Sequence, residues 1–328
     1  MCIRDSCYNA FSPDPFPKAN QMTSVYGEIA ALLTAACWSF NSVVFTLAGK
    51  RVGSSAVNSV RLWIALPALM LLNWALFGTP LPLDIELDRF FYLGLSGVIG
   101  FVIGDAMLFE SFLLIGPRRT MLLALLVPVF GAFLAWAFLG ETLRVLEIAS
   151  ILVTIGGVAW VVAERTTPES DPLSALPREK LLGIWLAVGG AAGQALGLLF
   201  SRLGLAGDYS AISATLVRVG VAGLLLALLN LFQGKLRGHL AAMKDGRALL
   251  QISAGSLTGP VLGVILSLVA IANAHIGVAS TLMSLTPVML LPVSHFLFRE
   301  KITSRAVAGT LVALLGVCLL YTSPSPRD

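Results

Sequence analysis

Three ionisable side chains, Asp105, Arg61 and Arg218, lie inside apolar segments of the chain. A charge at the centre of a bilayer costs at least about 2.5 kcal/mol, so each group must find a partner, reach water or become neutral. Arg61 and Arg218 are the natural partners of Asp105. Two interpretations stay open at this point. Asp105 and Arg61 could form a structural salt bridge, or these residues could bind a substrate or carry a proton.

Aromatic and amide side chains add to this set. Trp38 and Asn41 lie in the first apolar segment, and Gln194 lies at a related position in the sixth. Near the middle of a membrane such groups either pack between helices or line a central pocket with a few well-placed polar atoms. We predict a substrate cavity lined by Trp38, Asn41, Arg61, Asp105, Gln194 and Arg218.

The sequence gives little support for catalysis. Ile103, Gly104 and Asp105 resemble part of the GxGD signature of intramembrane aspartyl proteases, but residue 102 is valine and no second Asp lies in another span. No Ser/His pair is placed for a serine mechanism, and no His/Glu cluster is placed for zinc. We therefore expect no enzyme activity, no metal and no cofactor, and an intramembrane enzyme is the less favoured alternative.

Composition places the chain in a membrane. Of its 328 residues, 57% are hydrophobic and 12% are charged, whereas a soluble domain carries about 25% charge. Continuous apolar runs of about 20 residues predict helices, because backbone groups in lipid must be satisfied internally. The net charge of +4 falls in loops, which indicates membrane topology rather than nucleic-acid binding. Hydropathy predicts ten spans, at 25–48, 57–77, 90–114, 120–139, 146–163, 181–202, 211–232, 248–271, 276–297 and 303–320.

The third to fifth spans occur twice. Sliding the sequence by 159 residues places residues 100–157 on residues 259–316 without a gap. Each half then has five spans, an odd number, so the halves enter the membrane in opposite directions, as in many secondary transporters. We predict an all-α integral membrane protein with ten transmembrane helices, arranged as two inverted five-helix repeats. The repeat aligns six motif residues in pairs: Gly104 with Gly263, Pro128 with Pro287, and Glu141 with Glu300.

These motif residues have structural interpretations. The two glycines end runs of small residues at four-residue spacing, which allow helix backbones either to pack closely or to line a cavity. The two prolines permit kinks at matched depth, which serve either packing or a rocking motion of the halves. The two glutamates begin the last hairpin of each half, where we expect them to pair with a nearby base or cap a helix.

Polar stretches divide the chain. We predict an N-terminal tail at 1–24, a first repeat at 25–163, a linker at 164–180, a second repeat at 181–320, and a short segment at 321–328. The terminal sequences MCIRDS and YTSPSPRD resemble translated sequencing adaptors, and we expect both to be foreign to the native protein. Most Lys and Arg residues fall in loops on the side opposite the termini. The positive-inside rule therefore predicts that both termini lie outside the cytoplasm.

The first repeat contains GDAMLFESFLLIGPRRTMLLALLVPVFGAFLAWAFLGE, followed by a Gly-rich span. This stretch resembles the EamA-type signature of the drug/metabolite transporter superfamily, and AIANAHIGVASTLMSLTPVMLLPVSHFLFREKIT is a looser second copy. The resemblance covers about residues 25–320. One departure is Arg299, which stands where the first repeat has Gly140.

The resemblance implies a secondary transporter that exports or exchanges small metabolites, such as amino acids or drug-like compounds, across a prokaryotic inner membrane. It also implies cytoplasmic termini, which is opposite to the prediction from charge. No ATP-binding motif is visible, so a gradient must supply the energy, with proton coupling through the buried charges as one option. A passive channel is the alternative, although no ring of like charge or filter-like loop is visible. The expected partners are a small-molecule substrate and the lipid bilayer, with no nucleic acid. The sequence determines neither substrate nor oligomeric state.

Overall fold

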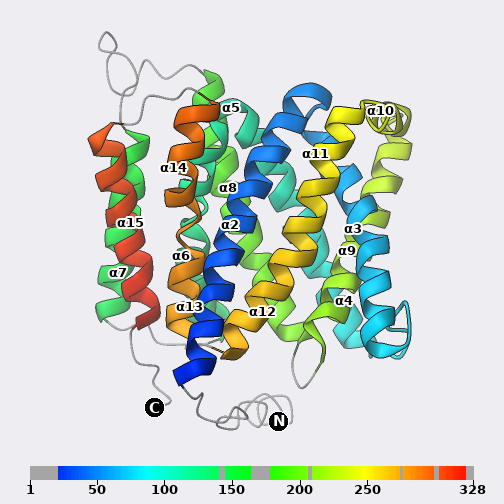
Figure 1. Ribbon diagram of the computed structural model, residues 1–328, viewed down its shortest axis with the longest axis horizontal. Coiled ribbons are helices and arrows are strands. Elements are labelled where there is room, and N and C mark those ends of the chain that lie inside the picture. Colours follow the sequence, from blue (N-terminus) through cyan, green and yellow to red (C-terminus); the bar gives the residue numbers. More distant parts are fainter. Residues whose placement is uncertain are drawn as a thin grey trace.

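Every regular element of the described chain is a helix. The computed structural model describes residues 21–139, 145–163, 178–205, 209–273, 276–298 and 303–322. The helices run roughly side by side along one direction (Figure 1). Seven of them are long and apolar enough to cross a membrane, and shorter apolar helices lie among them. The predicted motif residues Glu141 and Glu300, and most of the predicted linker, lie outside the described residues.

The helices of the first half lie close to the positions of the predicted spans. They are α2 (Gln21–Val52), α3 (Ser54–Phe77), α4 (Leu87–Gly97), η2 (Val98–Gly104), α5 (Asp105–Leu123), α6 (Leu126–Leu139) and α7 (Val145–Val162). The predicted third span is therefore divided into α4, the π-helical segment η2 and the start of α5. Within α5, Gly116 has φ 83° and interrupts the helix just before Pro117. This break separates the third span from the fourth.

The second half follows the same order. Its helices are α8 (Arg178–Gly204), α9 (Ala211–Phe232), α10 (Leu236–Ala242), α11 (Gly246–Ser256), η3 (Leu257–Gly263), α12 (Val264–Asn273), α13 (Ile276–Met283), α14 (Thr286–Leu297) and α15 (Ser304–Thr322). The π-helical segment η3 begins and ends 159 residues after η2. Hydropathy does not reveal either segment, because a π-turn changes hydrogen bonding and leaves the apolar run unbroken. Such turns are frequent at functional sites.

The two matched prolines begin helices, whereas the sequence predicted that they would bend them. Pro128 lies in the first turn of α6 and Pro287 in the first turn of α14, so each starts a new helix after a break. Proline suits this position because the first turn needs no backbone donor. The carbonyls left free are used locally: Ala124 O accepts from Val127 N at 3.0 Å, and Met283 O accepts from Thr286 Oγ1 at 3.0 Å.

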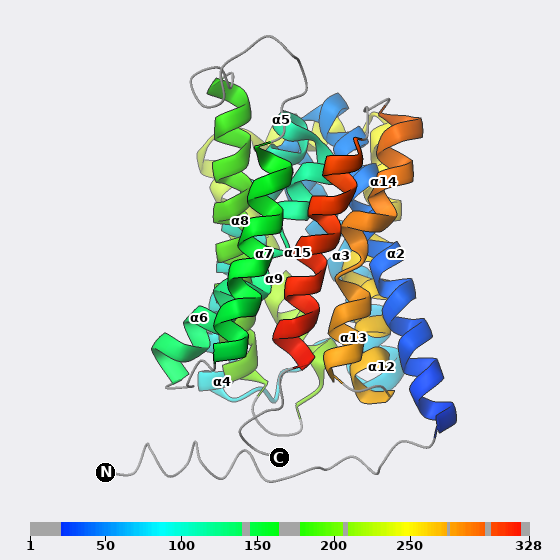
Figure 2. The same ribbon diagram turned by 90° about the vertical axis from the view of Figure 1, so that its left-hand side faces the viewer.

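Helices of one half pack against helices of the other half. Helix α2 packs against α11, η3 and α12, while α8 packs against α4, η2 and α5. The first helix of each half thus lies along the divided helix of the other half. Helices α3 and α9 pair with each other, as do α7 and α15, which stand side by side in Figures 1 and 2. These pairs join equivalent helices of the two halves.

Close backbone contact in the α7–α15 pair depends on glycine. A Cβ on Gly157 would lie 2.4 Å from Ala313 N, and a Cβ on Gly316 would lie 2.5 Å from Thr154 N. Each of these contacts maps onto the other when the sequence is shifted by 159 residues. Small residues allow such contact where lipid provides no hydrophobic drive for helix association.

We expect Gly157→Ala to destabilise the protein by about 1–3 kcal/mol, because the methyl group would force the backbones of α7 and α15 apart. The adjacent Gly156→Ala is the matched control. A Cβ there meets nothing within 4 Å, so this change should be neutral or stabilise the helix by up to about 1 kcal/mol. Thermal unfolding in detergent measures both. Equal melting temperatures for the two variants would contradict the predicted contact.

Candidate functional site

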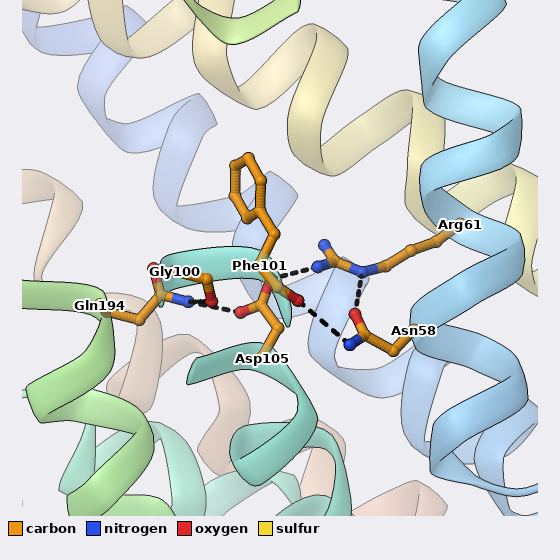
Figure 3. A network of polar contacts seen from close by, with 6 residues as sticks. All are labelled: Asn58, Arg61, Gly100, Phe101, Asp105 and Gln194. Carbon is orange, nitrogen blue, oxygen red and sulfur yellow. Dashed lines mark hydrogen bonds and ion pairs between the residues drawn. The ribbon is translucent and has the colours of Figure 1, made fainter. Parts of the chain in front are cut away.

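A buried ion pair lies at the centre of the polar network in Figure 3. Arg61 of α3 donates through Nη2 to Asp105 Oδ2, at the start of α5. Only 6% of the Arg61 side chain and 10% of the Asp105 side chain are exposed. The structure thus brings together the two charges whose pairing the sequence left open. Inside a membrane, the pairing offsets part of the free energy that each buried charge would cost alone.

The π-helical segment η2 forms a second set of contacts through the carbonyl of Gly100. Gly100 O accepts from the Asp105 backbone N–H and from Gln194 Nε2 at 3.2 Å. Gln194 Nε2 also donates to Asp105 Oδ1 at 2.5 Å. Gln194 belongs to α8 of the second half, and Figure 3 shows it reaching Asp105 from the side opposite Arg61. The two carboxylate oxygens of Asp105 are therefore held by both halves of the protein.

Asn58 is a member of the network that sequence reasoning missed. Arg61 Nε donates to Asn58 Oδ1 at 3.1 Å, and Asn58 Nδ2 donates to Phe101 O of η2 at 3.1 Å. Asn58 precedes Arg61 by three residues on α3, so both side chains share one helix face. An amide three residues from an arginine inside an apolar segment is the signal that could have identified it. Asn58 fixes the guanidinium and also satisfies a carbonyl of the π-helical segment.

Aromatic rings complete the surroundings of the cations. The Arg61 guanidinium carbon lies 4.7 Å from the centre of the Phe109 ring and 5.7 Å from that of Phe101. The Arg218 guanidinium carbon lies 4.7 Å from the centre of the same Phe101 ring. Attraction between a desolvated cation and an aromatic ring is worth up to about 2 kcal/mol. Phe101 therefore brings both arginines to one place.

Arg218 of α9 is held differently from Arg61. Its Nε is buried and finds no hydrogen-bond partner among the residues that the structure describes. Its backbone carbonyl is so close to Gly97 that a Cβ on that glycine would lie 2.3 Å from the oxygen. Asp105 attracts Arg218 electrostatically, but the only ion pair that Asp105 forms in the described chain is with Arg61. The backbone of Arg218 is thus firmly placed while its guanidinium lacks a direct anionic partner.

Trp38 and Asn41 lie against the other π-helical segment. A Cβ on Gly263 would be 3.2 Å from Trp38 Nε1, and one on Gly259 would be 2.2 Å from Asn41 Nδ2. Trp38 packs with an apolar cluster from α2, α12 and α13, and Asn41 Oδ1 is buried without a partner in the described chain. These two residues make no hydrogen bond to the Asp105 network there. The six predicted residues thus form two groups, one on each π-helical segment.

The two groups meet through apolar contacts. Val102 of η2 and Val261 of η3 pack into one cluster with Leu62 and Val219, from the paired helices α3 and α9. Gly104 and Gly263 occupy equivalent places but have different neighbours. Gly104 approaches the backbone of Gly193, while Gly263 faces the Trp38 side chain.

In the part of the chain that is described, no group of three or more His, Cys, Asp or Glu residues could hold a metal ion.

We expect the Arg61–Asp105 pair to be strongly coupled. Arg61→Met or Asp105→Leu alone should destabilise the protein by about 3–5 kcal/mol, because each leaves one buried charge unpaired. The double variant should cost much less than the two single changes together. Combining Asp105→Leu with the exposed Arg178→Met is the control and should be additive. Thermal unfolding of the purified variants gives the comparison, and additivity of the Arg61 and Asp105 changes would disprove the coupling.

Comparison with known proteins agrees with this architecture. The chain matches the EamA-like transporter family over residues 25–163 and again over residues 181–322. No curated protein sequence matches it. A solved structure described only as "Crystal structure of protein" superposes with a TM-score of 0.58, covering 90% of this chain and 96% of its own, at 14% identity. That likeness shows the fold alone. The two family matches span most of the chain, so this multi-pass membrane protein belongs to the EamA-like transporter family.

Proposed function

We propose that the protein is a secondary transporter that exports or exchanges a small metabolite by alternating access. It has ten transmembrane helices in two inverted five-helix halves, and in a prokaryote it lies in the inner membrane. Family membership supports transport in general. The observation that carries the mechanism is the pair of π-helical segments 159 residues apart, each packed on the first helix of the other half. Equivalent contacts of this kind allow two conformations of similar energy.

Both ends of the bundle carry a contact between the halves that alternating access would open in turn. At one end, Arg51 at the close of α2 binds Asp245 Oδ2 through Nε at 3.0 Å and Nη2 at 2.8 Å. At the other end, Arg89 of α4 donates to Gly204 O of α8 at 3.0 Å. Asp245 and Glu86 are the N-cap residues of the equivalent helices α11 and α4. The two contacts therefore occupy related positions on opposite faces.

The buried network supports the function in a different way. Asp105 has Val264 at the equivalent position of the second half, so the scaffold repeats but the charged site does not. A single asymmetric site between two similar halves suits a substrate-binding position that each face reaches in turn. In this proposal Trp38, Asn41, Arg61, Asp105, Gln194 and Arg218 form that position. The passive channel is the alternative, and it would need no opening and closing of the contacts at the two ends.

Transport in proteoliposomes tests the proposal. Purified protein should catalyse saturable uptake of a labelled amino acid or related metabolite, and excess unlabelled compound inside should accelerate it by counterflow. Protein-free liposomes are the control. Uptake that never saturates and shows no counterflow would favour the channel. An imposed pH gradient tests coupling separately, because uptake that is indifferent to the gradient would exclude proton coupling and leave exchange.

The Arg51–Asp245 contact gives a further prediction. The pKa of Asp245 lies below its usual value because Arg51 and the Ala248 N–H donate hydrogen bonds to its carboxylate. A lowered pKa means that the contact contributes its full stability above the usual Asp pKa of about 3.9 and loses it as pH falls through the lowered value. The contact should therefore be intact from pH 5 to 8, and Asp245 should not carry a coupled proton in that range.

Asp245→Asn separates the two roles of this residue. Asparagine still caps α11 but cannot pair with Arg51, so the melting temperature should change little while the counterflow rate changes. Asp245→Ala removes the cap as well and should lower the melting temperature. The exposed Asp88→Asn, in the first turn of α4, is the matched control and should leave transport unaffected. A counterflow rate for Asp245→Asn equal to that of the control would rule out a gating role.

A further inference from the structure

The charges around Phe101 do not balance. Two guanidinium groups lie over this ring, and Asp105, bound by Arg61, is the only carboxylate paired with either of them in the described chain. The site therefore holds one positive charge in excess. We propose that Arg218 binds the carboxylate group of the transported molecule, so that the substrates are small organic carboxylates. This inference rests on the proposed transport function and goes beyond it by naming the substrate class.

Gly100 faces the Arg218 guanidinium with no side chain of its own. A Cβ on Gly100 would lie 3.8 Å from Arg218 Nη2, 3.9 Å from Gln194 Oε1 and 3.9 Å from Gly197 Cα, in ordinary contact with all three. Glycine at this position thus keeps a side chain from standing between the guanidinium and the amide. Gln194 already donates through Nε2 to Gly100 and Asp105, which leaves its Oε1 as an acceptor. That atom suits an amine or hydroxyl donor on the same molecule.

The chemistry of the cation selects the anion. Guanidinium binds carboxylate through two parallel hydrogen bonds, in a planar arrangement that an ammonium group lacks. One carboxylate would neutralise the excess charge, whereas a doubly charged phosphate ester would leave the site negative. Arg218 Nε is buried and has no hydrogen-bond partner in the described chain. An unsatisfied buried donor costs about 1–3 kcal/mol, so a ligand acceptor that reached this donor would recover part of that cost.

The opposing interpretation is that Arg218 simply stabilises the fold, as Arg61 does. The two interpretations predict different results for one substitution. Without ligand, Arg218→Met should change the melting temperature little, because removing a half-buried cation that has no ion-pair partner in the described chain offsets the loss of its contact with the Phe101 ring. Arg61→Met should lower it, because that change strands Asp105. A drop for Arg218→Met as large as that for Arg61→Met would overturn the proposal.

Binding is tested with matched pairs of compounds at pH 7. The pairs are 4-methylvalerate with 4-methylvaleramide, L-leucine with L-leucinamide, and L-phenylalanine with L-phenylalaninamide; glycerol phosphate is added as a phosphate ester. The readout is the ligand-dependent rise in melting temperature of the purified protein. We expect each stabilising acid to act at lower concentration than its amide, with no effect of the phosphate ester. A panel in which no acid stabilises the wild type more than its amide, or in which the phosphate ester stabilises best, would refute the substrate class.

Variants assign the effect to Arg218. Arg218→Gln should weaken binding of the acids about 10- to 100-fold, the loss expected for hydrogen bonds between charged groups, and should abolish the preference over the amides. Arg218→Lys should keep part of that preference because it keeps the charge. The exposed Arg178→Gln is the matched control and should bind as the wild type does. Retained preference in Arg218→Gln would show that another group recognises the carboxylate.

Counterflow separates the two proposals. If acids bind in an Arg218-dependent manner but proteoliposomes show no counterflow, the transport proposal fails and the binding site stands. If neutral compounds show counterflow that Arg218→Gln leaves unchanged, transport stands and the carboxylate site fails. Gly100→Ala gives an independent check, because its methyl group fits at ordinary contact distance and would stand 3.8 Å from Arg218 Nη2 and 3.9 Å from Gln194 Oε1. It should weaken acid binding while Arg218 is intact, and wild-type affinity in this variant would place the ligand elsewhere.

Discussion

A carboxylate buried among apolar helices must have a cation beside it, and this requirement organises the centre of the protein. Asp105 begins α5 directly after a π-helical segment, and Arg61 meets it from α3. Because a buried charge without a partner is so costly in lipid, the pair fixes the position of α3 relative to the divided helix. Gln194 then extends the same network to α8. One ion pair thus joins both halves of the molecule at the level where the helix ladder is disturbed.

The surrounding scaffold repeats while its chemistry does not. The π-helical segments are 159 residues apart, and the contact of Gly157 with Ala313 has its counterpart in that of Gly316 with Thr154. Yet Gly97 and Gly104 of the first divided helix lie against the backbones of α9 and α8, whereas Gly259 and Gly263 of the second lie against the side chains of Asn41 and Trp38. Symmetric packing suits a protein with two related conformations. Asymmetric side chains give it one site rather than two.

The excess positive charge follows from this asymmetry. With Asp105 present in only one half, Arg61 has an ion-pair partner and Arg218 has none among the residues that the structure describes. A membrane interior makes such an imbalance expensive, whereas a water-filled cavity or an anionic ligand would relieve it. The rigid placement of the Arg218 backbone against Gly97 and of its guanidinium over Phe101 indicates that the cation is held in position. The energetic cost of the unpaired charge and the selectivity for an anion are then two aspects of one arrangement.

The sequence by itself determined the helical membrane fold, the repeat and the charged residues inside apolar segments. The length of the apolar runs, the similarity of the two halves and the positions of the charges can all be recognised from the order of the residues alone. The sequence also placed Asp105, Arg61 and Gln194 among the site candidates, and all three meet in the structure. Only the tertiary structure decided that Trp38 and Asn41 pack on the second π-helical segment, that Asn58 completes the network, and that the matched prolines begin helices. These features depend on which carbonyls remain free and which helices become neighbours. Hydrophobic patterning carries no information about either, because π-turns and exchanged partners leave the apolar pattern unchanged.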